Sequence, residues 1–210
     1  MFRIRGTLSD YDREQAEQCF LALQDNCHIT TLKDSDISKT TRVLRGFEIL
    51  KGWDDITVAA LCSLSRNSRK VKYCILVMDK TTESVGSRGQ KYTHHINEAY
   101  QLFIVDLKED LGHISIRPET IIDKISELFG NIDIDFRKHP LFSKRYFVLA
   151  ATRDDESKFR KQVEGKFLET IAQHKDLRIE TKAKKMIVMT GTRINQGDAV
   201  KLAEFVFELE

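Results

Sequence analysis

Three nearly continuous apolar runs, at residues 56–64, 71–78 and 102–107, constrain the fold of this chain more than any other feature of its sequence. Each run is shorter than a typical buried helix, and such a run is typical of a β-strand that is covered on both faces. Residues 113–117 instead alternate apolar with polar side chains, as in a strand with one solvated face. We also assign residues 42–53 to this β-rich region. Together these segments predict an antiparallel sheet covered by helices.

Two helices are predicted near the ends of the chain. Ser9 can cap the first, whose opening turn contains Asp10 and Asp12, because a side-chain oxygen at the N-cap accepts from an unpaired helical N–H. Its apolar face consists of Ala16, Cys19, Phe20, Leu23 and Cys27. The last helix begins near Asn195, and its inward face consists of Ala199, Leu202, Ala203 and Val206.

The region after residue 117 alternates helices and strands irregularly. Pro118 suits the first position of a helix that Gly130 ends. A half-buried strand is expected at residues 131–136, where Ile and Phe alternate with Asp. We then predict a strand at 145–151, a helical stretch at 155–174 with a break near Gly165, and strands at 177–181 and 185–190. This order favours an α+β fold over a doubly wound parallel one.

Nothing in the sequence marks a linker, because the chain has only two prolines and no low-complexity tract. We therefore expect a single domain over residues 1–210, or two packed halves at residues 1–112 and 113–210. Residues 80–95 are rich in Gly, Ser, Thr and charge. Because this segment is too polar to pack, we predict a long mobile hairpin loop there.

Composition points to an ordinary globular protein. The 34 basic and 32 acidic residues give a formal charge of +2, which lacks the excess of a nucleic-acid or membrane binder. No apolar run approaches the ~18 residues of a membrane span, so we expect a cytoplasmic protein without an integral membrane segment. The four cysteines stand singly in apolar segments; this placement is typical of buried thiols in a reducing compartment.

A small polar cluster is the first candidate site. Asp133 and Asp135 project from the same face of the expected strand, and His139 follows four residues later. Paired carboxylates with an imidazole could bind a divalent cation. The alternative is that the two aspartates mark the solvated face of an edge strand and deter edge-to-edge pairing.

Two basic turns are the second candidate. One contributes Arg66, Arg69, Lys70 and Lys72, and the other contributes Lys182, Lys184 and Lys185. Clustered cations could contact phosphates, but neither cluster is interleaved with aromatic residues, so solvated turns are the simpler interpretation. His94 and His95 are adjacent, and adjacent strand residues point to opposite faces, so they should not share a site.

Residues 118–148 resemble a prokaryotic family of unknown function. The resemblance rests on Pro118 and Glu119, on the segment from Asp133 to Phe136, and on His139, Pro140, Phe142, Ser143, Arg145 and Tyr146, which are similar to a core "PE…DIDF…HPxFSxRY". Members often carry hydrophobic helices ahead of this domain, which implies a cytoplasmic module tethered to a membrane. The family has no established catalytic residues, so the resemblance implies none here.

The residues around His139 and Pro140 are interpreted as a structural corner with Phe142 in the core. The sequence contains no G-x-S-x-G, H-E-x-x-H or phosphate-loop motif. We therefore predict a non-enzymatic protein-interaction or regulatory module that needs no cofactor or metal. Its expected partner is a protein or peptide, not a nucleic acid. The alternative is a metal-dependent phosphodiester or nucleotide hydrolase that uses Asp133, Asp135 and His139.

Overall fold

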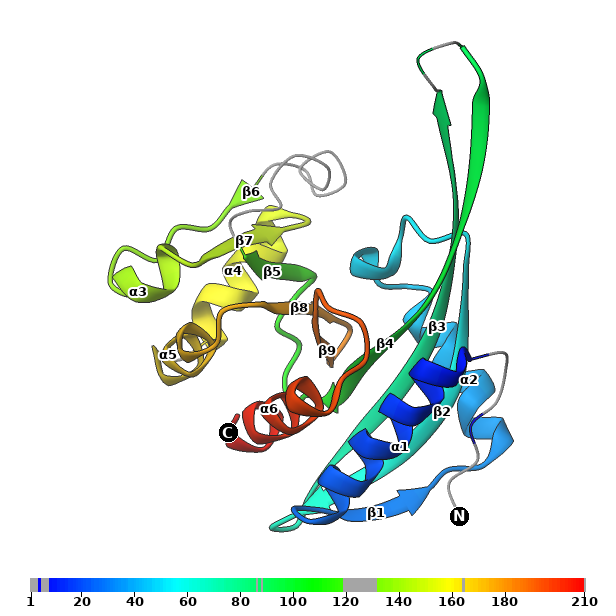
Figure 1. Cartoon of the computed structure of the whole chain (residues 1–210). Helices are drawn as coiled ribbons and strands as arrows, with labels where there is room; N and C mark the ends of the chain where they lie inside the picture. The colour runs from blue at the N-terminus through cyan, green and yellow to red at the C-terminus, as the bar shows by residue number, and fades with distance from the viewer. Residues whose placement is uncertain are drawn as a thin grey trace.

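The computed structural model describes residues 4, 8–85, 87, 89–118, 132–163 and 165–209. Within them the strands form one antiparallel sheet in the order β1-β2-β3-β4-β9-β8-β5-β7-β6 (Figure 1). The strands are β1 His28–Thr31, β2 Asp55–Arg66, β3 Arg69–Val85, β4 Lys91–Asp106, β5 Ile114–Pro118, β6 Ile132–Asp133, β7 Tyr146–Ala150, β8 Leu177–Lys182 and β9 Lys185–Thr190. The helices are α1 Asp10–Gln24, α2 Asp34–Leu44, η1 Glu48–Leu50, α3 Pro140–Ser143, α4 Arg153–Gln162, α5 Gly165–Gln173 and α6 Gln196–Glu208. The α+β prediction is confirmed.

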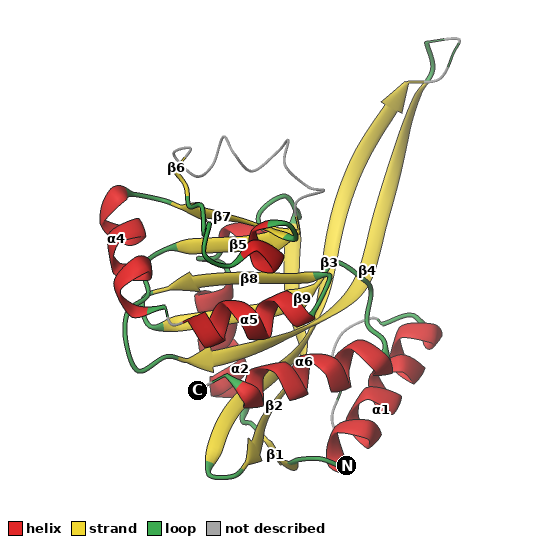
Figure 2. Ribbon diagram, turned by 90° about the vertical axis from the view of Figure 1, so that its left-hand side faces the viewer, coloured by secondary structure: helices red, strands yellow, loops and turns green. Residues whose placement is uncertain are grey.

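Helices cover both faces of the central strands, which explains the continuous apolar runs. Helices α1, α5 and α6 lie on one face (Figure 2), where Tyr73 and Phe103 join the larger core. On the other face α2 and η1 contribute Leu44 and Leu50 to a second core that includes Leu76. Because successive strand residues point to opposite faces, a strand between two cores needs apolar side chains at nearly every position.

The predicted N-caps of the first and last helices are confirmed. The Ser9 Oγ accepts from the Asp12 N–H at 3.1 Å, and the Asn195 Oδ1 accepts from the Asp198 N–H at 2.8 Å. The apolar faces of both helices are buried as expected. One detail differs, because α1 ends at Gln24 and Cys27 is buried in the following turn.

The strand predicted at residues 42–53 is wrong. This segment contains the end of α2, a turn and the single turn η1. The start of α2 carries the acidic residues Asp34 and Asp36, and the Asp36 carboxylate accepts from the Lys33 N–H at 3.1 Å. Thr40 and Leu44 are its only fully buried residues. Ile37, Thr40 and Leu44 follow the i, i+3, i+7 spacing of one helical face, so an amphipathic period is present, although few apolar residues carry it.

The mobile loop predicted at residues 80–95 is also wrong. Here β3 and β4 continue as a two-stranded ribbon, paired from Lys80 with Ile96 out to Val85 with Lys91. Figure 1 shows the paired segments of this ribbon, residues 80–85 and 91–96, projecting beyond the rest of the molecule. Most of its side chains are exposed on both faces. We call it the arm; its polar sequence reflects solvent on both sides of a strand pair, not irregular backbone.

The region at residues 118–148 is described in part. Pro118 is the last residue of β5, not the first of a helix, and the rest of the predicted helix lies outside the described residues. The expected strand at 131–136 is reduced to β6, although Ile134 is buried and its N–H donates to the Val148 carbonyl at 2.9 Å. The predicted break near Gly165 is confirmed between α4 and α5.

The expected structural corner is present at α3. Phe142 is only 1 % exposed, and its ring stacks on Tyr146 and meets Phe136 edge-on, with 5.6 Å between ring centroids in each case. His139 is partly exposed and lies against Gly165, where a Cβ would approach its ring carbon to 2.8 Å. The Arg145 guanidinium donates to the Ala172 carbonyl.

One sheet contains strands from both predicted halves, because β4 pairs with β9 from Leu102–Met189 to Asp106–Lys185.

All four cysteines are buried, as predicted. Burial raises the pKa of the Cys62 thiol to about 12, so it is protonated and unreactive near neutral pH. Within the described chain, no helix has both the length and the apolar character needed to cross a membrane.

Candidate functional site

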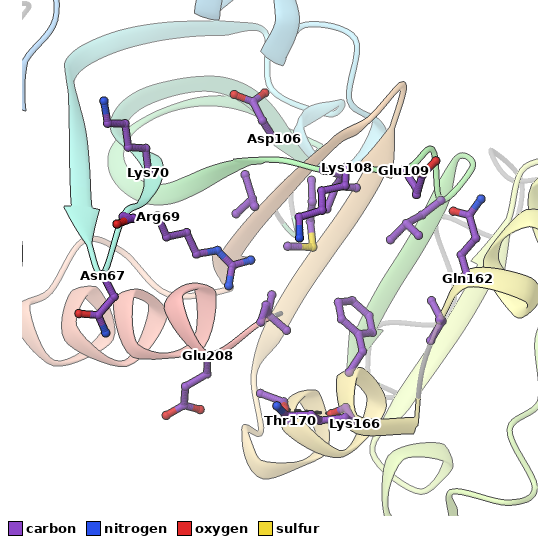
Figure 3. Close-up of a pocket in the computed structure, with 18 residues that line it drawn as sticks. Asn67, Arg69, Lys70, Asp106, Lys108, Glu109, Gln162, Lys166, Thr170 and Glu208 are labelled. Atoms are coloured by element: carbon purple, nitrogen blue, oxygen red, sulfur yellow. Dashed lines mark hydrogen bonds between the residues drawn. The ribbon is translucent and has the colours of Figure 1, made fainter.

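A groove of about 920 Å³ opens where five parts of the chain meet (Figure 3). Its walls are the β2–β3 turn at residues 67–70, residues 105–109 and 111 at and after the end of β4, residues 162, 163, 166, 167 and 170 around the α4–α5 junction, Met186 of β9, and the end of α6. Apolar side chains form much of its lining, among them Leu107, Phe167, Met186 and Leu209. A concave, largely apolar cavity of this size with a few polar groups is the usual form of a small-molecule site.

The groove is lined by four cations and three acids, namely Arg69, Lys70, Lys108 and Lys166, and Asp106, Glu109 and Glu208. Arg69 and Lys108 point toward one another across it, whereas Lys70 and Asp106 point away (Figure 3). The Asp106 carboxylate is already paired with the Lys185 ammonium. Among the described residues no acid forms an ion pair with Lys108. An anion between Arg69 and Lys108 would therefore be stabilised by both cations.

The β2–β3 turn places Arg69 at the groove. Asn67 and Ser68 have φ angles of 49° and 66°, as both central residues of a tight type I′ hairpin turn require. Arg69 then starts β3 directly opposite Arg66. Its Nη1 donates to the Phe207 carbonyl at 3.4 Å, which directs the guanidinium to the C-terminal end of α6, where the helix dipole favours a cation.

The four predicted phosphate contacts do not act as one cluster. Arg69 and Lys70 line the groove, but they are successive strand residues and so point to opposite faces. Lys72 shares the face of Lys70, and Arg66 is exposed outside the groove lining. Phosphate contact by these four residues stays a prediction, and the hairpin separates their side chains.

The second basic turn is engaged with backbone and acids. Lys182 donates to the Gly46 carbonyl at 2.9 Å, Lys184 donates to the Lys108 carbonyl at 3.0 Å, and Lys185 pairs with Asp106. Lys184 and Ala183 have positive φ angles of 58° and 48°, so this turn too is the predicted tight hairpin.

Asp133, Asp135 and His139 do not assemble into a metal site. No group of three His, Cys, Asp or Glu side chains placed to bind a metal ion occurs in the part of the chain that the structure describes, which includes these three. Asp135 pairs with Arg137 at 2.9 Å, and the His139 Nδ1 lies 4.0 Å from a Glu169 carboxylate oxygen. Partial desolvation and then the Asp135 charge raise the pKa of Asp133. Asp133 and Asp135 are both exposed.

The two adjacent histidines lie on opposite faces of the arm, as predicted. A His94 ring nitrogen is 2.9 Å from the Ser84 hydroxyl, and a His95 ring nitrogen is 3.4 Å from that of Thr81. They cannot converge on one ligand within a single arm.

The backbone of the arm leaves an open edge on β4. The Ala99 carbonyl, which accepts from Ile194 N–H, points away from β3, and this orientation repeats at every second residue of a strand. Thr93, His95 and Asn97 therefore direct their N–H and C=O groups outward, and no described strand pairs with β4 before Leu102. The edge of β3 is partly closed, because the Asp54 carboxylate accepts from the Thr81 N–H at 2.6 Å.

Sequence reasoning missed the groove and the open edge. The groove brings together residues that are nearly 140 positions apart, from Arg69 to Glu208 and Leu209. A local sequence pattern cannot predict contacts between such distant positions. A signal for the arm did exist, because Tyr92, Thr93 and Ile96 have high β-propensity within the polar segment.

Comparisons with models of protein families, with curated proteins and with solved structures found no match. The resemblance of residues 118–148 to a prokaryotic family therefore stays a prediction, and the following proposals rest on the geometry of this chain.

Proposed function

We propose that this chain is a protein-interaction module whose contact element is the arm. The observation that carries the proposal is a folded ribbon that stands clear of the molecule with both faces solvated and an unpaired edge on β4. An isolated two-stranded hairpin is only marginally stable in water. A partner that pairs with the edge would stabilise it by extending the sheet.

The mode of contact that fits this edge is addition of a strand. Thr93, His95 and Asn97 offer outward N–H and C=O groups at the spacing at which an extended peptide can form backbone hydrogen bonds. The edge is also long enough for several bonds before Ala99, whose carbonyl is used within the chain.

Charge defines the chemistry of the partner. In the sequence, residues 80–96 have a formal charge of +2, from Lys80, Arg88 and Lys91 against Glu83, which equals that of the whole chain and leaves the remainder neutral. Lys91 and His95 lie on one face of β4, and Tyr92, 50 % exposed, lies with Ile96 on the other. The expected partner is an extended protein segment with acidic residues on one face and apolar residues on the other.

The substitution Thr93→Pro tests this proposal. It removes an outward N–H and places a ring on the edge without breaking a bond to β3, whereas Thr93→Ala keeps the N–H and serves as the matched control. We expect one protein captured from a lysate of the source cells to bind the native chain and Thr93→Ala, and to be lost with Thr93→Pro. Once purified, that partner should slow hydrogen exchange at the amides of Thr93, His95 and Asn97.

Equal capture by Thr93→Pro and Thr93→Ala would contradict strand addition. Capture that nuclease abolishes and that falls steeply with salt would instead identify a nucleic acid as the partner. The hydrolase alternative receives less support, because its three candidate ligands do not come together in the described structure.

A further inference from the structure

We propose that the groove between the β2–β3 turn, the end of β4 and α5 binds a small anionic amphiphile. The ligand would place a phosphate or carboxylate head between Arg69 and Lys108 and an aliphatic body along the apolar lining. This site lies at the opposite end of β4 from the arm and is independent of the function proposed above.

The cavity has the size and lining for such a body. Its volume of about 920 Å³ is near the upper end of the range of small-molecule sites. Leu107, Leu111, Val163 and Phe167 are partly exposed yet pack against the main core. Covering them would remove apolar surface from water, at about 0.8 kcal/mol for each buried methylene.

The head group is selected by the arrangement of charge. Arg69 and Lys108 approach from two walls, so an anion between them contacts two cations that different parts of the chain hold in place. The Asp106 carboxylate faces away and is paired with Lys185, and Glu208 also points away (Figure 3). A neutral amphiphile would lack the attraction to these two cations, and a bare anion would leave the apolar walls exposed.

Isothermal titration calorimetry with four probes separates the contribution of the charged head from that of the alkyl body. Every alkyl probe is used below its critical micelle concentration. Decyl phosphate and decanoate carry the two candidate heads, decanol lacks the charge, and inorganic phosphate lacks the alkyl body. We expect saturable binding of at least one of the two alkyl anions, at least tenfold tighter than decanol and inorganic phosphate. Whichever alkyl anion binds more tightly identifies the natural head group. Shortening its chain from ten to eight carbons should weaken binding about fourfold per methylene.

Substitutions locate the binding site. Lys108→Gln and Arg69→Gln should each weaken binding of the tighter anion at least tenfold, because a charge-assisted contact is lost. Arg69→Lys should recover part of the loss. Lys70→Gln is the matched control, because Lys70 borders the groove but points away from it (Figure 3), and binding should be unchanged. Lys108 is exposed, so its substitution stays informative if Arg69→Gln fails to fold.

Several results would overturn the proposal. These are absence of saturable binding, equal affinity for decanol, no dependence on chain length, or equal losses in Lys70→Gln and Lys108→Gln. Tighter binding of adenosine monophosphate than of either alkyl anion would point to a nucleotide site instead. Thr93→Pro should not alter binding in the groove, so this experiment and the test of the arm can fail separately.

Discussion

Glu180 illustrates how single residues hold this fold together. Its side chain has no solvent-exposed surface, and a buried carboxylate is costly unless donors replace its water. Three do so: the N–H groups of Glu48 and Ile49, at 2.9 and 2.7 Å, and the Nε2 of His113 at 2.7 Å. One side chain therefore ties β8 to η1 and to the start of β5. Its partners are 67 to 132 residues away, and the sequence gives no sign of them.

Phe142 is the residue whose removal should weaken the corner most. It is almost fully buried between Phe136 and Tyr146, so Phe142→Ala removes a ring and leaves a cavity. We expect a loss of roughly 3 to 5 kcal/mol in the free energy of unfolding, measured by urea denaturation.

The neighbouring His139→Ala is the control for this prediction. His139 is partly exposed and has only a distant carboxylate near it, so its loss should be within about 1 kcal/mol. The opposite order, a harmless Phe142→Ala and a strongly destabilising His139→Ala, would show that the corner is held by the imidazole.

Among the elements, those with a buried apolar face were predictable and those without one were not. The strands at 56–64, 71–78 and 102–107 were predictable because each lies between two cores and therefore has apolar residues at nearly every position. The arm lies outside both cores, and the helical period of α2 rests on few apolar residues, so it was overlooked. For the candidate site, the basic turn was predictable from its cations, but the groove was not, because its other walls come from α5, α6 and the end of β4.

The arm should contribute little to the stability of the isolated chain. Replacing residues 83–93 with Asn-Gly would join Thr82 to His94, a pair whose N–H and C=O groups face each other across the ribbon, through a favoured two-residue turn. Because the described side chains among those removed are exposed and closure entropy varies slowly with length, the free energy of unfolding should change by less than about 1 kcal/mol. A fall in melting temperature of ten degrees or more in differential scanning calorimetry would mean that the arm packs on the body.

At the scale of the whole molecule, β9 joins the two halves of the chain. It lies between β4 and β8, and Leu102 and Ile104 of β4 share a core with Ile187 and Met189 of β9. The sheet therefore has no natural boundary between residues 1–112 and 113–210 at which one part could separate without exposing apolar surface.

This arrangement predicts a single cooperative unfolding transition. Trp53, the only tryptophan, packs edge-on against Tyr100 with 5.4 Å between ring centroids, so its fluorescence reports on the first half. Far-ultraviolet circular dichroism reports on the whole chain. The two signals should give the same urea midpoint. Midpoints that differ clearly would reveal two units that unfold separately.

The position of β9 also has a consequence for synthesis on the ribosome. Until residues 185–190 have left the exit tunnel, the first half of the chain has no partner for the apolar end of β4. An uncovered hydrophobic strand edge is prone to pair with other chains. The nascent protein therefore passes through an interval in which it is most vulnerable to aggregation, and the need for a chaperone should fall sharply once β9 is inserted.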